Sequence, residues 1–262
     1  MSKKVIRGDI QGIIVFSLIV VLFIGCQNRS TTADRESWVV MPVSQWPDFA
    51  LTNTVRFTDT TFTEIANAFL IDTGYDTLGV TCKHFFLLFK KIGLTHIDPG
   101  AGLEEWSAYP KARPDKKVEF GEMINKDSIE ETGEFNTLKD RDWILFRLKN
   151  GTNGVYPLKI RMTPLEKGET VYSVGWSAIQ NTEEPLLARM QVWENMGNYC
   201  YISTPDANVD PHGSSGSPVI DTNGHLVGLV SGAEGDLGVI AAVPCLVSLF
   251  EKYGIDFEGI RQ

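Results

Sequence analysis

Three short motifs contain side chains that together can activate a hydroxyl group for nucleophilic attack. His84 ends Thr81-Cys82-Lys83-His84, Asp142 begins Asp142-Trp143-Ile144-Leu145-Phe146, and Ser215 lies inside Gly213-Ser214-Ser215-Gly216-Ser217-Pro218. A serine hydroxyl becomes a strong nucleophile when an imidazole accepts its proton and a carboxylate orients that imidazole. Because each motif borders a strand-like apolar run, the sequence predicts that His84, Asp142 and Ser215 form one catalytic group.

The general base can be chosen among four histidines. His84 follows a buried-strand pattern that begins at Leu78, and such a strand would fix its position. His96 lies in a predicted loop, and His225 follows an Asn-Gly turn, where we expect it to point into water. His212 is three residues before Ser215 on the same loop, too constrained to reach behind the hydroxyl. His84 is therefore the predicted base.

Two aspartates compete for the role of the group that orients this imidazole. Asp142 directly precedes the apolar run Trp143–Leu148, so its carboxylate would be buried beside the base. Asp140 lies two residues earlier and would share its strand face if the strand extended that far. We predict Asp142 and keep Asp140 as the alternative.

The hydroxyl motif offers three serines, of which Ser215 is preferred over Ser214 and Ser217. With Ser215 as nucleophile, the backbone N–H groups of Gly213 and Ser215 can point together at a developing oxyanion. One such donor typically stabilises the transition state by ~2.7–4 kcal/mol. Glycine at position 213 leaves its amide unobstructed by a side chain.

The elements that must position these residues are mostly strands. Short apolar or alternating runs recur between turn signals, which favours an antiparallel sandwich or barrels over alternating βαβ units. Asn223-Gly224 predicts a tight hairpin, Pro244–Tyr253 a terminal helix, and 93–116 a long polar loop. The runs are Thr63–Ile71, Leu78–Phe86, Val118–Ile124, Trp143–Leu148, Val171–Trp176, Leu187–Trp193, Tyr199–Ser203, Val219–Asp221, Leu226–Ser231 and Val239–Val243.

The N-terminal residues have the features of a targeting segment. Basic residues precede the mostly apolar run Gly12–Gly25, which is shorter than the ~20 residues of a membrane span. Gly25-Cys26 resembles the cleavage site of a bacterial lipoprotein. We predict a signal peptide over residues 1–25, acylation of Cys26 and a polar tether over 26–45; an uncleaved anchor or a plain secretory signal is the alternative. Gln27 favours an outer-membrane or cell-surface location for an extracytoplasmic protein.

Charge and cysteine content limit the partners and the means of stabilisation. After residue 25 the chain has 21 basic and 32 acidic residues, a net charge of −11, which argues against nucleic acid as a partner. Cys82, Cys200 and Cys245 are too few for a disulfide framework. Free buried thiols are favoured, although a Cys82–Cys200 or Cys200–Cys245 bridge stays open. We expect no cofactor and no metal ion.

Taken together, the motifs resemble those of chymotrypsin-like serine peptidases, nearest the bacterial trypsin-like branch that includes the HtrA-type proteases. Thr81–His84 is similar to the family's Thr-Ala-x-His, Asp142–Phe146 to Asp-Ile-Ala-Leu-Leu, and Gly213–Pro218 to Gly-Asn/Asp-Ser-Gly-Gly/Ser-Pro. Gly168–Trp176 and Leu226–Gly232 resemble two further strands of the family. The 47 residues after Ser215 are too few for a PDZ domain, so none is expected.

This resemblance implies an all-β fold of two antiparallel six-stranded barrels, followed by a short C-terminal helix. The peptidase domain would span residues 46–262, with the first barrel at about 46–150 and the second at about 151–248. His84 and Asp142 would come from the first barrel and Ser215 from the second. Val230, Ser231, Gly232 and His212 would contact the substrate, and the strand residues among them would pair with its backbone.

The same resemblance bears on specificity and activation. Val209, Gly232 and Gly238 fall where the family places pocket-lining residues, and none is charged, so an apolar or small side chain before the scissile bond is expected. Asp210 lies close enough to count against this expectation. Ser214 replaces the acidic residue that pairs with a new N-terminus in zymogens, so activation by that ion pair is not expected.

Three functions are compatible with this sequence. The first is a serine endopeptidase that cleaves extracytoplasmic proteins or peptides through an acyl-enzyme. The second is a lipid-anchored binding module that has the protease fold without its activity. The third is an esterase, which would use the same machinery. The sequence does not indicate an oligomeric state.

Overall fold

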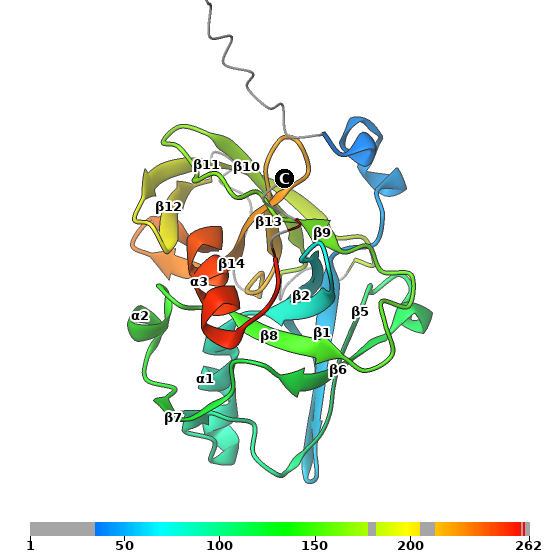
Figure 1. Ribbon diagram of the computed structural model, residues 1–262, viewed down its shortest axis with the longest axis vertical. Helices are drawn as coiled ribbons and strands as arrows, with labels where there is room; N and C mark the ends of the chain where they lie inside the picture. The colour runs from blue at the N-terminus through cyan, green and yellow to red at the C-terminus, as the bar shows by residue number, and fades with distance from the viewer. Residues whose placement is uncertain (1–34, 178–181, 205–212, 258, 260–262) are drawn as a thin grey trace, which may run out of the picture. The chain divides into compact units, whose positions relative to one another are not determined.

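The computed structural model describes residues 35–177, 182–204, 213–257 and 259, and its strands form two closed barrels (Figure 1). The first barrel contains six antiparallel strands in the order β1-β5-β6-β8-β3-β2, closed by pairing of β1 with β2. A short strand, β9 (Leu158–Lys159), adds to β2 in parallel. The six strands are β1 (Leu51–Phe57), β2 (Thr60–Asp72), β3 (Thr77–Thr81), β5 (Leu103–Tyr109), β6 (Val118–Met123) and β8 (Ile144–Leu148).

The second barrel is also closed and antiparallel, in the order β10-β11-β12-β15-β14-β13. Its last strand leads directly into helix α3 (Val243–Tyr253), which packs against β14 and β15 and ends at Gly254 in the left-handed conformation. The predicted fold of two six-stranded barrels with a C-terminal helix is therefore confirmed. The strands are β10 (Thr170–Gly175), β11 (Leu186–Asn195), β12 (Tyr199–Ser203), β13 (Pro218–Ile220), β14 (Leu226–Glu234) and β15 (Leu237–Ala242).

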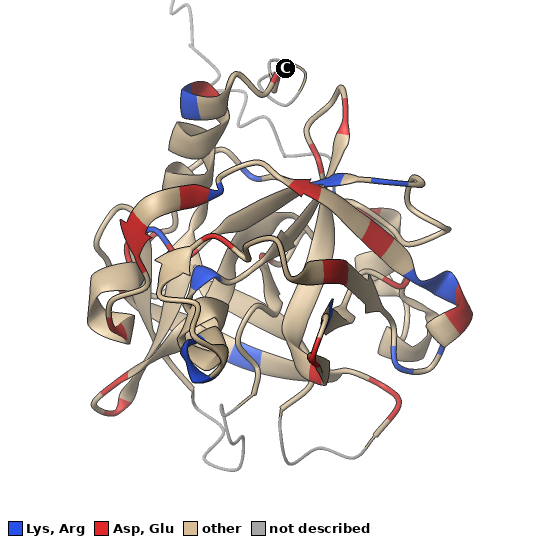
Figure 2. Cartoon of the chain, turned by 90° about the horizontal axis from the view of Figure 1, so that it is seen from below, with Lys and Arg blue, Asp and Glu red and all other residues tan. Residues whose placement is uncertain are grey.

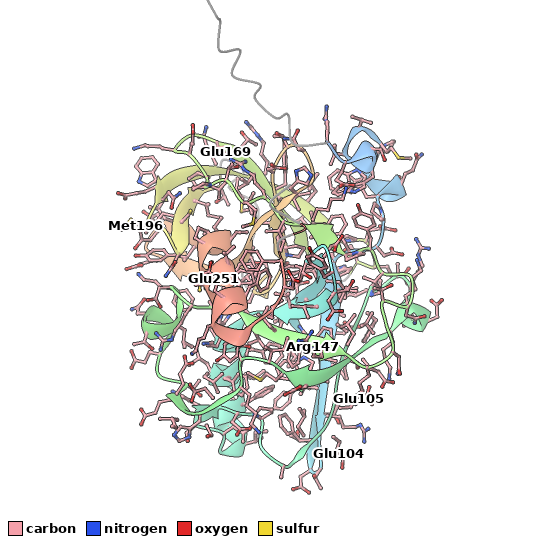
Figure 3. All side chains as sticks on the ribbon, in the orientation of Figure 1. Glu104, Glu105, Arg147, Glu169, Met196 and Glu251 are labelled. Carbon is pink, nitrogen blue, oxygen red and sulfur yellow. The ribbon has the colours of Figure 1, made fainter. Side chains whose placement is uncertain are left out.

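Buried apolar side chains fill both barrels (Figure 3). In the first barrel the rings of Phe120 and Phe146 stack with their centroids 4.8 Å apart, and Trp106 packs against Phe146. Gly79 on β3 faces these rings, and a Cβ there would lie 2.5 Å from Phe120. The apolar cluster of this barrel extends into the second barrel, so the two barrels share core contacts. The second-barrel strand residues in it are Val174, Ile220, Leu226, Leu229 and Ala241.

Two regions differ from the sequence prediction. The run Leu78–Phe86 is a strand only as far as Thr81, and it continues as a 3-10 turn over Lys83–Phe85 and a short helix, α1 (Phe86–Phe89). The helical turn buries the Phe86 and Phe89 rings together. Residues 93–116 are not all loop, because they contain β5, whose buried Trp106 supplies a core-facing side chain.

Hydrogen bonds and the burial of the Glu36 and Trp38 side chains fix part of the segment predicted as a tether. Residues Ser37–Val40 and Val43–Gln45 form 3-10 turns, and Trp38 is buried. The N–H of Glu36 donates to the carbonyl of Asn223 over 3.0 Å, in the hairpin between β13 and β14. This segment therefore covers the turn that the sequence predicted at Asn223.

The described part of the chain provides no helix long and apolar enough to cross a bilayer. Its acidic and basic residues are interspersed in the view of Figure 2. Cys82, Cys200 and Cys245 are free and buried, as favoured from the sequence. Burial raises the pKa of the Cys200 and Cys245 thiols to about 11, so both stay protonated at neutral pH.

Candidate active site

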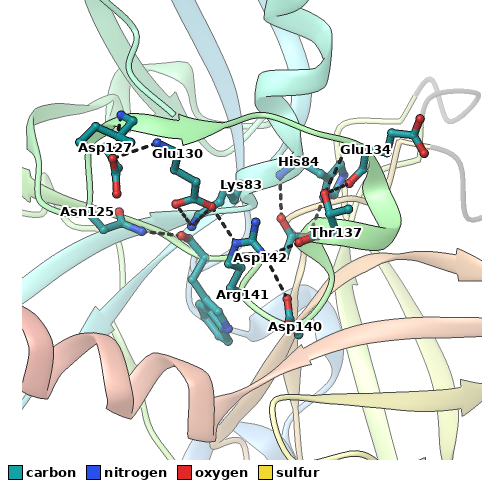
Figure 4. Close-up of polar contacts among 12 residues, drawn as sticks. Lys83, His84, Asn125, Asp127, Glu130, Glu134, Thr137, Asp140, Arg141 and Asp142 are labelled. Atoms are coloured by element: carbon teal, nitrogen blue, oxygen red, sulfur yellow. Dashed lines mark hydrogen bonds and ion pairs between the residues drawn. The ribbon is translucent and has the colours of Figure 1, made fainter. Parts of the chain in front are cut away.

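The first barrel brings His84 and Asp142 into direct contact (Figure 4). His84 lies on the 3-10 turn that follows β3, rather than at the end of a strand, and Asp142 directly precedes Trp143 and β8. Because β3 and β8 are paired, their ends meet at one edge of the barrel. The distance from His84 Nδ1 to Asp142 Oδ2 is 2.6 Å, and the backbone N–H of His84 donates to Oδ1 over 2.7 Å.

The Asp142 carboxylate is fully buried and receives a third hydrogen bond, from the hydroxyl of Ser231 on β14 of the second barrel. These three donors compensate for the hydration that the buried carboxylate has lost. Burial lowers the pKa of the His84 imidazole, but the charge of Asp142 and its hydrogen bond outweigh burial and hold the pKa well above 6.5. The pair is therefore arranged to stabilise an imidazolium.

Asp140, the alternative to Asp142, does not contact the imidazole. Its side chain is 54% exposed and pairs with Arg141 at 3.5 Å. The turn between α2 (Phe135–Leu138) and β8 thus sends one aspartate into the barrel junction and the other to the surface.

An ionic cluster around the buried Lys83 lies beside the His84–Asp142 pair (Figure 4). Lys83 is 3% exposed, and its Nζ lies 3.1 and 3.0 Å from the two carboxylate oxygens of Glu130. Arg141 Nε donates to the same carboxylate over 2.7 Å. Lys83 and Arg141 are the residues that precede His84 and Asp142, so Glu130 holds both neighbouring backbone segments together. Burial raises the pKa of Glu130, but these cations outweigh burial and lower it below its usual value.

Glu130→Gln is expected to lower the free energy of unfolding by about 3 kcal/mol, because the buried ammonium of Lys83 would lose its carboxylate. This stabilisation should be present above the usual carboxyl pKa and should disappear as the pH falls through the lowered pKa of Glu130. Urea unfolding at several pH values measures both effects.

Glu104→Gln serves as the control for this measurement. Glu104 pairs with Arg56 at the surface, with side chains 41% and 47% exposed, and lies at the far end of the first barrel in Figure 3. Its removal should cost less than about 1 kcal/mol. Equal losses for the two variants would show that the ionic cluster contributes no more than a surface pair.

Ser215 lies on the turn between residue 213 and strand β13, and this turn is hydrogen-bonded to β14. The Gly216 N–H donates to the Val230 carbonyl over 2.8 Å, and the Val230 N–H donates to the Ser217 carbonyl over 2.9 Å. Gly213 and Gly216 have φ of 86° and 77°, which a residue with a side chain rarely adopts. Among the described residues, no acceptor takes a hydrogen bond from the N–H of Gly213 or Ser215.

The structure brings the Ser215 turn to the junction that holds the His84–Asp142 pair. Val230, which pairs with Gly216, is followed by Ser231, whose hydroxyl reaches Asp142. Within the described residues, no hydrogen bond joins the Ser215 hydroxyl to the imidazole, whose Nε2 lies 3.7 Å from the sulfur of Cys82. The serine motif and the His–Asp pair therefore meet without a direct bond between them.

Of the other predicted residues, His225 differs from expectation. It is only 6% exposed rather than solvated, because the segment that contains Glu36 covers its hairpin. The predicted loop position of His96 is also wrong, because His96 is half-buried on the short strand β4 (His96–Ile97), which pairs with β7 (Asp127–Glu131). Cys26, Val209, Asp210 and His212 lie outside the described residues.

A mainly apolar pocket opens into the second barrel beside Ser214. Gly232 and Gly238, both predicted to line a specificity pocket, are among its walls, and the exposed Asp236 lies at its edge. Apolar side chains of the lining come from the four strands β11, β12, β14 and β15. They are Leu186, Ala188, Met190, Ile202, Val230 and Leu237.

Phe135 on α2 stands between the imidazole and β14. Its ring meets that of His84 edge-on with centroids 5.8 Å apart, and a Cβ at Gly232 would lie 2.6 Å from it. Lys139, at the end of α2, binds Glu234 on β14 and the hydroxyl of Tyr201 on β12. This first-barrel segment is thereby attached to the second barrel beside the pocket.

Sequence reasoning did not find Glu130, Phe135 or Asn67, which all contact the site. Glu130 lies on β7, whose mostly acidic and polar sequence gives no signal of burial. Asn67 did carry a signal, since it is a polar residue inside the apolar run Thr63–Ile71. A buried amide in a strand requires polar partners, which a sequence pattern alone does not identify.

Comparisons with known proteins agree with this architecture. A family model for the trypsin-like peptidase domain matches residues 66–229, whereas no curated protein matches the chain in sequence. In fold, the chain is similar to the active form of the Rv3671c protease from M. tuberculosis, at 17% identity over 85% of this chain and 88% of that one, with a TM-score of 0.52.

Two further solved structures share the fold. A serine endoprotease from Yersinia pestis is 14% identical over 84% of this chain, with a TM-score of 0.52, and the match spans 65% of that protein. Neuropsin, a serine protease expressed in mouse brain, is 14% identical over 81% of this chain and 96% of that one, with a TM-score of 0.56. The family match covers more than half of the chain and includes His84, Asp142 and Ser215. The chain belongs to the family of trypsin-like peptidase domains.

Proposed function

We propose that the protein is a serine endopeptidase in which Ser215 attacks the scissile carbonyl, His84 accepts its proton and Asp142 orients the imidazole. The observation that carries this proposal is the buried His84–Asp142 pair, with 2.6 Å between Nδ1 and Oδ2, at the junction where the Ser215 turn meets the first barrel. Asp142 fixes the tautomer that leaves Nε2 free to take a proton.

The N–H groups of Gly213 and Ser215 form the proposed oxyanion hole. Two features support this role: the left-handed φ of Gly213, which orients its amide, and the lack of an internal acceptor for either group among the described residues. The hydrogen bond between Ser215 and His84 is expected to form when substrate binds, because catalytic hydrogen bonds are often long in free enzymes.

The substrate backbone is proposed to pair with β14 at Ser231 and Gly232. β15 occupies one side of this segment, and β13 pairs with β14 only as far as Leu229, so no described strand covers the other side. A peptide added there would direct the side chain that precedes the scissile bond toward the apolar pocket.

The lining of this pocket predicts a preference for an aliphatic residue before the scissile bond. In a series of peptides that differ only at that position, cleavage after Leu or Val should exceed cleavage after Arg by about a hundredfold in kcat/KM. Liquid chromatography of the products locates the cut. Faster cleavage after Arg would contradict the pocket assignment, and cleavage of esters but of no amide would favour esterase activity instead.

The cellular setting proposed for this enzyme rests on the sequence of residues 1–45. A signal peptide would be removed before Cys26, and the acylated cysteine would anchor the domain to an extracytoplasmic membrane face, through the tether that precedes Glu36. Kinship with the HtrA-type branch is part of the same proposal, on the motif resemblance. Peptide substrates near that membrane would then be the physiological partners.

A further inference from the structure

Asn67 on β2 binds the nucleophile turn from the first barrel through both its backbone and its side chain. The residue is 1% exposed, and its backbone N–H donates to the Ser215 carbonyl over 2.6 Å. Its side-chain Nδ2 donates to the carbonyl of Gly213 over 3.1 Å. One residue therefore binds the carbonyls on both sides of the amide that joins Ser214 to Ser215.

The same side chain also binds the end of β10. Asn67 Oδ1 accepts from the N–H of Trp176 over 3.0 Å, and Nδ2 donates to the carbonyl of Trp176 over 3.0 Å. The amide thus forms a strand-like pair with Trp176 across the junction of the two barrels. All of its polar atoms have partners, so its conformation is fixed.

Local backbone geometry directs Asn67 toward the second barrel. The pairing of β1 with β2 skips Glu64 and Ala66, and both skipped residues have φ near 50°. Such bulges change the direction in which the following side chain points and occur next to active sites. Ala66 also has a rarely populated left-handed conformation, which persists only where the surroundings enforce it.

The fit between Asn67 and the turn is tight enough to require glycine on the other side. A Cβ at Gly216 would lie 2.1 Å from the Asn67 carbonyl oxygen, and a Cβ at Gly175 would lie 3.0 Å from Asn67 Oδ1. The Thr81 hydroxyl also donates to the backbone carbonyl oxygen of Asn67 over 2.7 Å. The turn and Asn67 are therefore in direct, close-packed contact.

We propose that Asn67 is a positioning residue, whose side-chain amide holds the Gly213 and Ser215 amides in the orientation needed to bind the oxyanion. This inference rests on the proposed peptidase function. The Gly213 carbonyl belongs to the peptide unit between Gly213 and Ser214, which links the two units that carry the donor N–H groups. Without the bond from Asn67 this linking unit can rotate, and the two donors would no longer converge. Misplacement of catalytic groups by about 1 Å can cost roughly a hundredfold in rate, and one oxyanion donor contributes a comparable factor.

The test compares Asn67→Ala and Asn67→Asp with the wild-type protein on one peptide substrate. Alanine removes the side-chain bonds but keeps the backbone N–H that binds Ser215. Aspartate keeps the size of the side chain and the acceptor for the Trp176 N–H, but it cannot donate to the Gly213 carbonyl. If the alanine variant does not fold, the aspartate variant provides the test by itself. For both variants, kcat and the rate of fluorophosphonate inactivation should fall roughly 10- to 100-fold, while KM changes by less than about threefold.

Asn195→Ala is the matched control, because it removes an asparagine that also donates to one carbonyl, Leu165, and accepts from one N–H, Gly197. Asn195 lies at the end of β11, outside the pocket lining and the nucleophile turn. Its kcat should stay within about twofold of wild type, even where the melting temperature falls. Wild-type kcat in the Asn67→Asp variant would overturn the inference while leaving the peptidase proposal intact. A wild-type protein that neither cleaves peptides nor reacts with a fluorophosphonate would instead defeat the proposed function.

Discussion

Ser215→Ala is expected to abolish peptide cleavage, with a fall in kcat of roughly 10⁶-fold, because no other group can form the acyl-enzyme. The fold should be unaffected, since the half-buried Ser215 side chain donates no hydrogen bond to another described residue and its backbone contacts with Asn67 remain. A steady-state assay and a melting curve on the same preparation measure both outcomes.

The neighbouring hydroxyls separate this assignment from its alternatives. Ser214→Ala should retain most of the activity, and Ser248→Ala, on the exposed face of α3, serves as the control for handling and folding. If Ser214→Ala were inactive and Ser215→Ala remained active, Ser214 rather than Ser215 would be the nucleophile.

Asp142→Asn is expected to have the next largest effect, a fall in kcat of about 10⁴-fold. An asparagine presents an N–H where His84 Nδ1–H now donates, so the imidazole would be held in the wrong tautomer. It would also leave the Ser231 hydroxyl and the His84 backbone N–H with a weaker shared acceptor. Asp140→Asn is the matched control, because Asp140 is exposed and contacts only Arg141 among the described side chains; its kcat should be unchanged.

The same pair of variants predicts a shift in pH dependence. His84 must be neutral to accept a proton, so wild-type kcat/KM should rise with pH through the pKa of His84, which lies above 6.5. Asp142→Asn removes the carboxylate that raises this pKa while leaving the burial that lowers it. The acid limb of the residual activity should therefore move to lower pH. A wild-type profile that is flat down to pH 4 would exclude His84 as the base.

Much of the fold was predictable because its determinants are local. Apolar runs separated by turn residues indicated most strands, Asn223-Gly224 indicated the β13–β14 hairpin, and the pattern before Gly254 indicated α3. Strand β5 was missed because Glu104 and Glu105 interrupt its apolar alternation. His84 was predicted at the end of a strand but lies on the turn after it, since periodicity does not distinguish the end of a strand from the tight turn that follows.

The supporting contacts of the site could not be predicted, because they join residues far apart in the chain. Glu130 is 47 residues from Lys83, and the Asn67 side chain binds groups 109 and 146 residues away. No spacing rule relates such residues before the barrels are assembled. The burial of His225 has the same origin, since it depends on a segment near Glu36 that folds back over a distant hairpin.

Fluorophosphonate labelling followed by peptide mapping tests the central claim most directly, because the reagent reacts with a serine only when base and oxyanion donors are aligned around it. We predict a single adduct on Ser215, lost in Ser215→Ala, strongly reduced in Asp142→Asn and unchanged in Asp140→Asn. A folded protein that forms no adduct, or forms it on another residue, would contradict the assignment of this site.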